Sequence, residues 1–187
     1  MSNDLIEELS NQIDWHWQNH ARPRLEGLTD EEYLWLPAGS GWTVRRREDD
    51  VPETVTRRLG GDLWLLDLGD HDLTPAPVTS IAWRIAHLIV AVLGPRTQSH
   101  FGGPEVDYNT WGYAGTAAEA LDQLDTAYAN WIAGMRGLTE ETLWQPVGPA
   151  EGHWHESPMI TLVLHIHREL IHHLAEVALL RDLWAHR

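Results

Sequence analysis

The segment His165–Glu176, near the C-terminus, places the strongest constraint on how this chain can fold. On a helix, which turns by about 100° per residue, a group of its polar side chains falls within an arc of about 100°. Three leucines, Leu162, Leu180 and Leu183, share this arc, so the polar group interrupts a stripe that is otherwise apolar and faces the core. Buried imidazoles and carboxylates without partners cost several kcal/mol. We therefore expect a metal ion, a hydrogen-bonded network, or both, among His165, Glu169, His172, His173 and Glu176.

Glu169 and His173 are four positions apart, a spacing that directs both side chains to one face of a helix. A third metal ligand has to come from another helix, and His87 is the best candidate because it lies in an apolar segment between Trp83 and Ala91. Two imidazoles and one carboxylate, with further positions open to water or substrate, describe both catalytic zinc sites and non-haem iron sites. The sequence therefore predicts a divalent-metal site at His87, Glu169 and His173, without choosing between zinc and iron.

The remaining polar residues of this segment are expected to assist the ligands. His165, His172 and Glu176 either orient the ligands or serve as alternative ligands, and Glu176 suits the first role because carboxylates commonly hold ligating imidazoles. If a water activated by the metal is the nucleophile, Glu176 or His165 is the expected catalytic base. His167 lies about 120° from His173 around the helix, and we expect it to face outward.

The composition limits the class of protein and its partners. The chain has 187 residues, 43% of them hydrophobic, which suits one domain over residues 1–187 with a substantial core. It has no cysteine, which excludes disulfides, thiolate metal sites and a cysteine nucleophile. The net charge of −15 argues against nucleic-acid binding, which uses basic surfaces. The acidic N-terminus does not resemble a signal peptide, and the most apolar run, residues 81–93, is too short to span a membrane. We therefore expect a soluble, cytoplasmic protein.

Apolar periodicity and start and stop signals predict helices at about residues 4–20, 80–93, 116–136 and 158–184. Ser80 and Thr116 are expected to cap the second and third of these helices. Ser157 is expected to cap the fourth, with Pro158 in its first turn. Gly94-Pro95 is expected to end the second helix.

Two connections have few helix signals. Residues 39–77 contain Gly60-Gly61, several prolines and the short apolar run 63–68, and we expect a long excursion with a short strand pair. Within it, Arg45–Arg47 is followed directly by three acidic residues and is expected to lie in a solvated loop. Residues 101–115 form a second connection, rich in glycine and aromatic residues.

A weak internal repeat relates Leu28–Pro37 to Leu138–Pro146 with one gap. Each copy follows a predicted long helix, and its threonine, Thr29 or Thr139, can cap a short helical turn that ends before a proline. Two interpretations stay open. The repeat reflects either a helix–turn–loop–helix unit used twice or a common pattern of cap and stop residues.

Two segments, Ser80–Leu88 with its His87 and His173–Glu176, resemble the DinB-like superfamily of damage-inducible four-helix bundles. The resemblance covers nearly the whole chain and is closest to actinobacterial members. Further matching segments are Trp15–Trp17, Arg22–Arg24 and Leu179–Leu183. The resemblance implies an all-α four-helix bundle with crossed connections and a long irregular insertion between the first two helices. It also implies a homodimer, because members often associate through faces of the bundle.

In this superfamily, one histidine of the second helix and an H-x-x-x-H pair of the fourth bind a divalent metal. Carried over by position, these ligands are His87, residue 169 and His173. Residue 169 is glutamate here rather than histidine, which is a departure from the pattern. Glutamate also binds zinc, nickel, manganese and iron, so a site is still expected, although its affinity and metal preference need not match those of three histidines.

The superfamily includes transferases and isomerases that depend on mycothiol or bacillithiol. The resemblance therefore implies an enzyme in which a metal binds a low-molecular-weight thiol such as mycothiol and stabilises its thiolate. The thiolate would then attack a small electrophilic substrate. A metal-dependent hydrolase is the alternative enzyme, and a non-catalytic bundle with a vestigial metal site is the alternative without activity.

Overall fold

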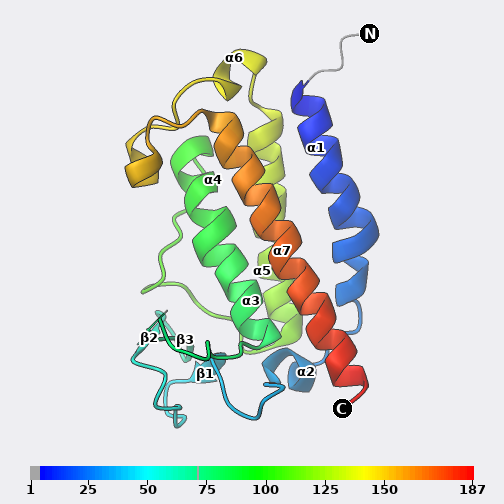
Figure 1. Ribbon diagram of the computed structural model, residues 1–187, viewed down its shortest axis with the longest axis vertical. Helices are drawn as coiled ribbons and strands as arrows, with labels where there is room; N and C mark the ends of the chain where they lie inside the picture. Colours follow the sequence, from blue (N-terminus) through cyan, green and yellow to red (C-terminus); the bar gives the residue numbers. More distant parts are fainter. Residues whose placement is uncertain (1–4, 71) are drawn as a thin grey trace.

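The computed structural model describes residues 5–70 and 72–187. Long helices lie side by side along the molecule, and a small sheet lies at one end (Figure 1). The helices and helical turns are α1 Leu5–His16, η1 Trp17–Ala21, η2 Pro23–Leu25, α2 Asp30–Leu34, α3 Ile81–His87, η3 Leu88–Leu93, α4 Gly94–Phe101, α5 Ala117–Arg136, α6 Glu140–Leu143, η4 Pro149–Trp154 and α7 Met159–Ala185. The strands are β1 Val44–Arg46, β2 Arg57–Leu59 and β3 Trp64–Leu68.

The helical prediction is confirmed for most of the chain, while the expected all-α class has to be amended. The four predicted helical ranges correspond to α1 with η1, to α3 with η3 and α4, to α5, and to α7. The described residues form seven α-helices rather than four, because the second predicted helix divides into α3 and α4 and the short helices α2 and α6 occupy connections. A three-stranded sheet is also present, where a strand pair was expected.

Gly94-Pro95 does not end the second predicted helix, which continues through α4 to Phe101. The preceding turn, η3, is a π-helix, and the Gly94 amide donates to the carbonyl five residues earlier, that of Ile89. Pro95 has no amide hydrogen for the Ala91 carbonyl, but the Arg96 guanidinium donates to that carbonyl instead. A side chain therefore replaces the backbone donor that proline removes, and the helical segment made of α3, η3 and α4 continues to Phe101.

Local capping follows the sequence closely. The Ser80 hydroxyl accepts a hydrogen bond from the Trp83 amide at 3.2 Å, and the Thr116 hydroxyl accepts one from the Glu119 amide at 3.3 Å. The two copies of the repeat form the short helices α2 and α6, each capped by its threonine. The exception is α7, whose cap position is Pro158 and not Ser157. Whether the repeat arose by duplication stays a prediction.

The sheet fastens the long excursion to α3. Its strand order is β1-β3-β2, with both neighbours antiparallel to β3. Asp67 of β3 is fully buried, accepts from the Thr43 amide at 3.0 Å and pairs with Arg45. Arg45 is therefore not in a solvated loop as expected, because it neutralises a buried carboxylate. The Trp83 indole donates to the Asp67 carbonyl at 2.8 Å, which connects the sheet to α3.

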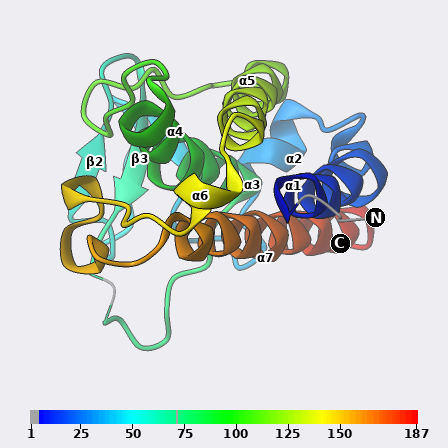
Figure 2. The same ribbon diagram turned by 90° about the horizontal axis from the view of Figure 1, so that it is seen from above.

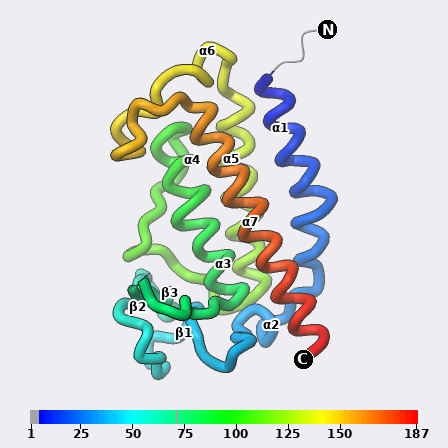
Figure 3. The backbone as a smooth tube through the Cα atoms, in the orientation of Figure 1, coloured from blue at the N-terminus to red at the C-terminus, as the bar shows by residue number. Residues whose placement is uncertain are grey.

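The rod formed by α3, η3 and α4 lies between α5 and α7, as the view from above shows (Figure 2). The chain path shows the excursion at the end of the molecule where α3 begins (Figure 3). Trp131 of α5 is fully buried and is one of the largest core side chains. Among the described residues, no helix combines the length and apolar character needed to cross a membrane.

Candidate metal centre

The three predicted metal ligands converge between α3 and α7. One ligand atom from each of His87, Glu169 and His173 lies within 4.8 Å of the other two. The His173 Nε2 atom is 3.4 Å from a Glu169 carboxylate oxygen, and the rings of His87 and His173 stand nearly perpendicular with centroids 4.7 Å apart. His173 is buried, while His87 and Glu169 are half-buried. The tertiary structure thus brings His87 to a pair of residues that lie 82 and 86 positions further along the sequence.

Packing orients the His87 ring, and burial keeps it neutral, as a metal ligand has to be. Its ring stacks on Trp83, one turn earlier, with an interplanar angle of 7° and a centroid distance of 5.2 Å. Burial, together with the neighbouring His173 and Arg84, lowers the pKa of His87 to about 4, so the ring is neutral at neutral pH. Within the described part of the chain, neither His87 ring nitrogen forms a hydrogen bond. A neutral imidazole with an unused lone pair fits a divalent metal.

Glu176 and Arg84 orient His173. The His173 Nδ1 atom is 2.7 Å from a Glu176 carboxylate oxygen, and the same oxygen is 3.0 Å from the Arg84 guanidinium. Arg84 also lies 3.4 Å from Nδ1, but the much shorter contact to the carboxylate places the proton on Nδ1. The lone pair is then on Nε2, the atom near Glu169. A ligating histidine held by a carboxylate through its other nitrogen is the usual arrangement in metal sites.

A second grouping shares His173. One ligand atom from each of His172, His173 and Glu176 also lies within 4.8 Å of the others. The His172 side chain is 62% exposed, and Glu176 is already paired with Arg84. The first grouping is therefore the better candidate. Its carboxylate, Glu169, has no ion pair with an arginine as short as that of Glu176, and its imidazoles are less exposed than that of His172.

The buried face of α7 is displaced from the predicted stripe. Its buried residues occupy an arc of about 140° centred between Leu170 and Val177, and the polar group lies along one edge of that arc. His167 is inside the arc and only 7% exposed, so the outward orientation predicted for it is wrong. Leu183, expected on the core face, is 46% exposed. The reason is that α7 contacts α3 and η3 on one side and η1 on the other, which buries a broad face. The edge position leaves the metal centre accessible to small molecules.

His165 lies between the metal centre and a cavity of about 480 Å³. Its Nδ1 atom is 3.5 Å from a Glu169 carboxylate oxygen and 2.6 Å from the Arg168 guanidinium. The cavity lies between α4, the first turns of α7 and the connection that precedes α7. Its lining residues are Arg96, Val147, Glu151, Trp154, Ser157, Thr161, Leu162, Leu164, His165 and Arg168.

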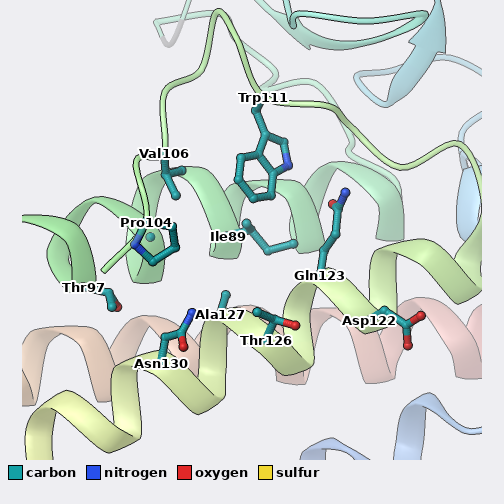
Figure 4. A pocket seen from close by; sticks show the side chains of 11 residues that line it. Ile89, Thr97, Pro104, Val106, Trp111, Asp122, Gln123, Thr126, Ala127 and Asn130 are labelled. Atoms are coloured by element: carbon teal, nitrogen blue, oxygen red, sulfur yellow. The ribbon is translucent and has the colours of Figure 1, made fainter. Parts of the chain in front are cut away.

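A second cavity, of about 260 Å³, lies on the other side of the same rod (Figure 4). Ile89 contributes to it and follows His87 by two positions, which on a helix places the two side chains on opposite faces. Val106 and Trp111 from the connection after α4 cover it, and Ala127 of α5 lines its floor (Figure 4). This cavity is mainly apolar and separate from the metal centre.

Three arginines around the metal centre and its cavity do not figure in the sequence prediction: Arg84, Arg96 and Arg168. For Arg84 a signal was available, because it is a charged residue in the apolar segment 81–93, three positions before His87. Arg96 pairs with Glu151, 55 positions away, which local spacing does not reveal. Arg168 contacts His165 and Glu169 on its own helix, so helical spacing offered a signal for it as well.

The geometry agrees with the expected metal-binding bundle, and the comparisons with known proteins test the family. No curated protein and no solved structure matches the chain. The model of the DinB superfamily matches residues 12–177, which span both predicted ligand helices and most of the chain. This chain therefore belongs to the DinB superfamily.

Proposed function

We propose that this protein is a divalent-metal-dependent enzyme that transfers a low-molecular-weight thiol such as mycothiol or bacillithiol to a small electrophile, or isomerises one with that thiol. The observation that supports it best is the convergence of His87, Glu169 and His173, with His165 between Glu169 and an open cavity. A bound divalent metal would supply the Lewis acidity that keeps a thiol as its thiolate near neutral pH.

Each residue then has a defined task. His87, Glu169 and His173 would hold the metal, while Glu176 fixes the His173 ring and Arg84 pairs with Glu176. The cavity next to His165 provides room for the electrophile. The chain has no cysteine, so the thiol has to arrive as a separate molecule.

A metal-dependent hydrolase is the second candidate, because His165 is a partly exposed imidazole beside Glu169. Hydrolysis needs a base that removes a proton from the attacking water, and both candidate bases already take part in hydrogen bonds or ion pairs. Glu176 accepts from His173 and pairs with Arg84, and the His165 Nδ1 atom accepts from Arg168. A thiol that is already ionised needs no such base, so the arrangement favours thiol transfer.

Metal content tests the ligand assignment. Native mass spectrometry on the full chain, after incubation with zinc, nickel, manganese or iron, should find one ion per chain. The two overlapping groupings are separated by three variants: His173→Ala removes a ligand from both, His87→Ala only from the first, and His172→Ala only from the second. We expect metal loss in the first two variants and retention in the third. Loss in His172→Ala with retention in His87→Ala would assign the metal to the second grouping.

Turnover separates the two enzyme classes. The metal-loaded protein is mixed with mycothiol, bacillithiol or cysteine and a fluorogenic bimane electrophile, with His87→Ala as the metal-free control. Conjugation that requires both thiol and metal supports the proposal. Metal-dependent hydrolysis of ester or amide substrates without thiol would favour the hydrolase instead.

We also propose that the protein is a homodimer, with α7 in the interface. Large apolar side chains on its outer surface are exposed, namely Leu164, Ile171, Leu179 and Leu183. Light scattering coupled to size exclusion should give twice the chain mass, and Ile171→Glu with Leu179→Glu should give the monomer. A monomeric wild-type protein at micromolar concentration would contradict this proposal.

A further inference from the structure

The cavity beside His165 combines hydrogen-bond donors, a positive charge and an apolar wall. We propose that it binds the carboxylate of a small organic acid with an apolar body, and that metal loading strengthens this binding through Glu169 and Arg168. The inference rests on the proposed function and names the substrate class of the same site.

The polar groups of this cavity are mainly donors. A guanidinium only donates, so the 2.6 Å contact between Arg168 and His165 Nδ1 makes that nitrogen an acceptor. The proton of the neutral His165 ring is then on Nε2. Among the described residues, the hydroxyls of Ser157 and Thr161 have no hydrogen-bond partner. Arg168, His165 and both hydroxyls can therefore donate to one ligand.

The charges leave one cation in excess. Glu151 is the only acid in the lining, and it is held by His100 at 2.9 Å and by Arg96 at 3.4 Å. Arg96 also donates to the Ala91 carbonyl, so its guanidinium already has partners within the protein. Arg168 is 70% exposed and provides the remaining positive charge. In a chain with a net charge of −15, a cavity with an excess positive charge favours an anionic ligand.

The apolar part of the lining requires a ligand with an apolar body. Val147 and Leu162 are buried, whereas Trp154 and Leu164 present 67% and 52% of their surface to solvent. An apolar cavity of about 150 Å³ accommodates benzene. A cavity of about 480 Å³ therefore has room for a ring or short chain together with its carboxylate.

Glu169 couples this cavity to the metal centre. Its carboxylate is 3.6 Å from Arg168 and 3.4 Å from His173 Nε2, so it stands between the guanidinium and the candidate metal ligands. A Glu169 carboxylate that serves as a ligand shares its negative charge with the metal and neutralises Arg168 less. By thermodynamic linkage, the carboxylate ligand and the metal then strengthen each other's binding.

The test compares an acid with its neutral isostere. Phenylacetate and phenylacetamide are titrated calorimetrically into the metal-loaded protein and into protein stripped with a chelator. We expect phenylacetate to bind at least about tenfold more tightly than the amide, and more tightly to the metal-loaded form. Arg168→Gln should remove the preference for the acid while retaining the metal and the fold, because this side chain is largely exposed. Arg57→Gln, on the exposed surface of β2, is the matched control and should behave as the wild type.

The outcomes separate this inference from the proposed function. Protein that loads metal but binds both probes equally overturns the carboxylate site and leaves the metal function standing. An unchanged preference in Arg168→Gln overturns the assignment of the cation. Equal affinity with and without metal overturns the coupling. Protein that binds no metal overturns the proposed function and the coupling together, while the chelator-treated samples still test the carboxylate site.

Discussion

His167 and His173, both on α7, are equally buried but differ in their polar contacts. Each histidine is 7% exposed. His173 donates to Glu176, lies near Glu169 and contacts the His87 ring. The Nε2 atom of His167 is buried and has no hydrogen-bond partner in the part of the chain that the structure describes, and burial lowers the pKa of this residue to about 4.

This difference shows that a buried histidine does not by itself indicate a site. His173 lies at the edge of the buried face, where residues of α3 and the polar edge of α7 meet. His167 lies at the opposite edge of that face, where its ring is buried and, among the described residues, its Nε2 atom has no hydrogen-bond partner. A metal centre needs convergent ligand atoms and access from solvent, and only the region around His173 offers both.

The largest effect is expected from the ligand itself. His173→Ala should weaken metal binding by more than the roughly 10–100-fold that is typical for losing a residue that supports a ligand. His167→Leu, equally buried, should retain the wild-type affinity. Competition titration against a chromophoric chelator measures both, and equal losses in the two variants would show that burial, not ligation, determines the effect.

The second effect concerns stability in acid. His167 titrates at about 4 when folded and near 6.5 when unfolded, so the unfolded state binds the proton first and stability is lost as the pH falls from about 6.5 to about 4. The full loss is of the order of 3 kcal/mol. His167→Leu removes this contribution, so its advantage over the wild type in urea unfolding should grow over that pH range. A constant difference from pH 7 to pH 4 would contradict the prediction.

The third effect separates orientation from ligation. Glu176→Gln keeps the size of the side chain but removes the charge that pairs with Arg84 and holds His173. We expect metal affinity to fall by roughly 10–100-fold, less than in His173→Ala. Glu156→Gln, with a side chain 89% exposed, is the control and should leave the affinity unchanged. A loss in Glu176→Gln as complete as that in His173→Ala would make Glu176 a ligand.

The smallest effect concerns the support of His87. Trp83→Phe preserves an aromatic surface for the His87 ring but removes the hydrogen bond to the Asp67 carbonyl. The stability of the fold should decrease by roughly 1 kcal/mol, with only a few-fold loss of metal affinity. Thermal unfolding and metal titration on the same samples check this. A large loss of affinity would mean that the sheet, through Trp83, positions the metal centre.

Much of the local structure was predictable because its interactions are local. The hydroxyls of Ser80 and Thr116 accept hydrogen bonds from amides three residues ahead, and such caps can be predicted from residues that are close together in the sequence. The pair Glu169 and His173 follows from helical spacing alone. His87 was identified as a polar residue in an apolar helix, and the structure places its ligand atom near the other two.

The tertiary structure decided how these elements are used. Which arc of α7 is buried depends on contacts with α3, η3 and η1, so the helical projection misplaced His167. The rod continues past Pro95, and the Arg96 side chain donates to the Ala91 carbonyl in place of the missing Pro95 amide, a contact that local spacing does not predict. The sequence by itself determined most of the helices, the caps at Ser80 and Thr116, and the pair Glu169 and His173, since these depend on residues within a turn of one another. Partners such as Arg84 for Glu176 and Arg45 for Asp67 depend on how separate elements pack, and only the folded chain brings them together.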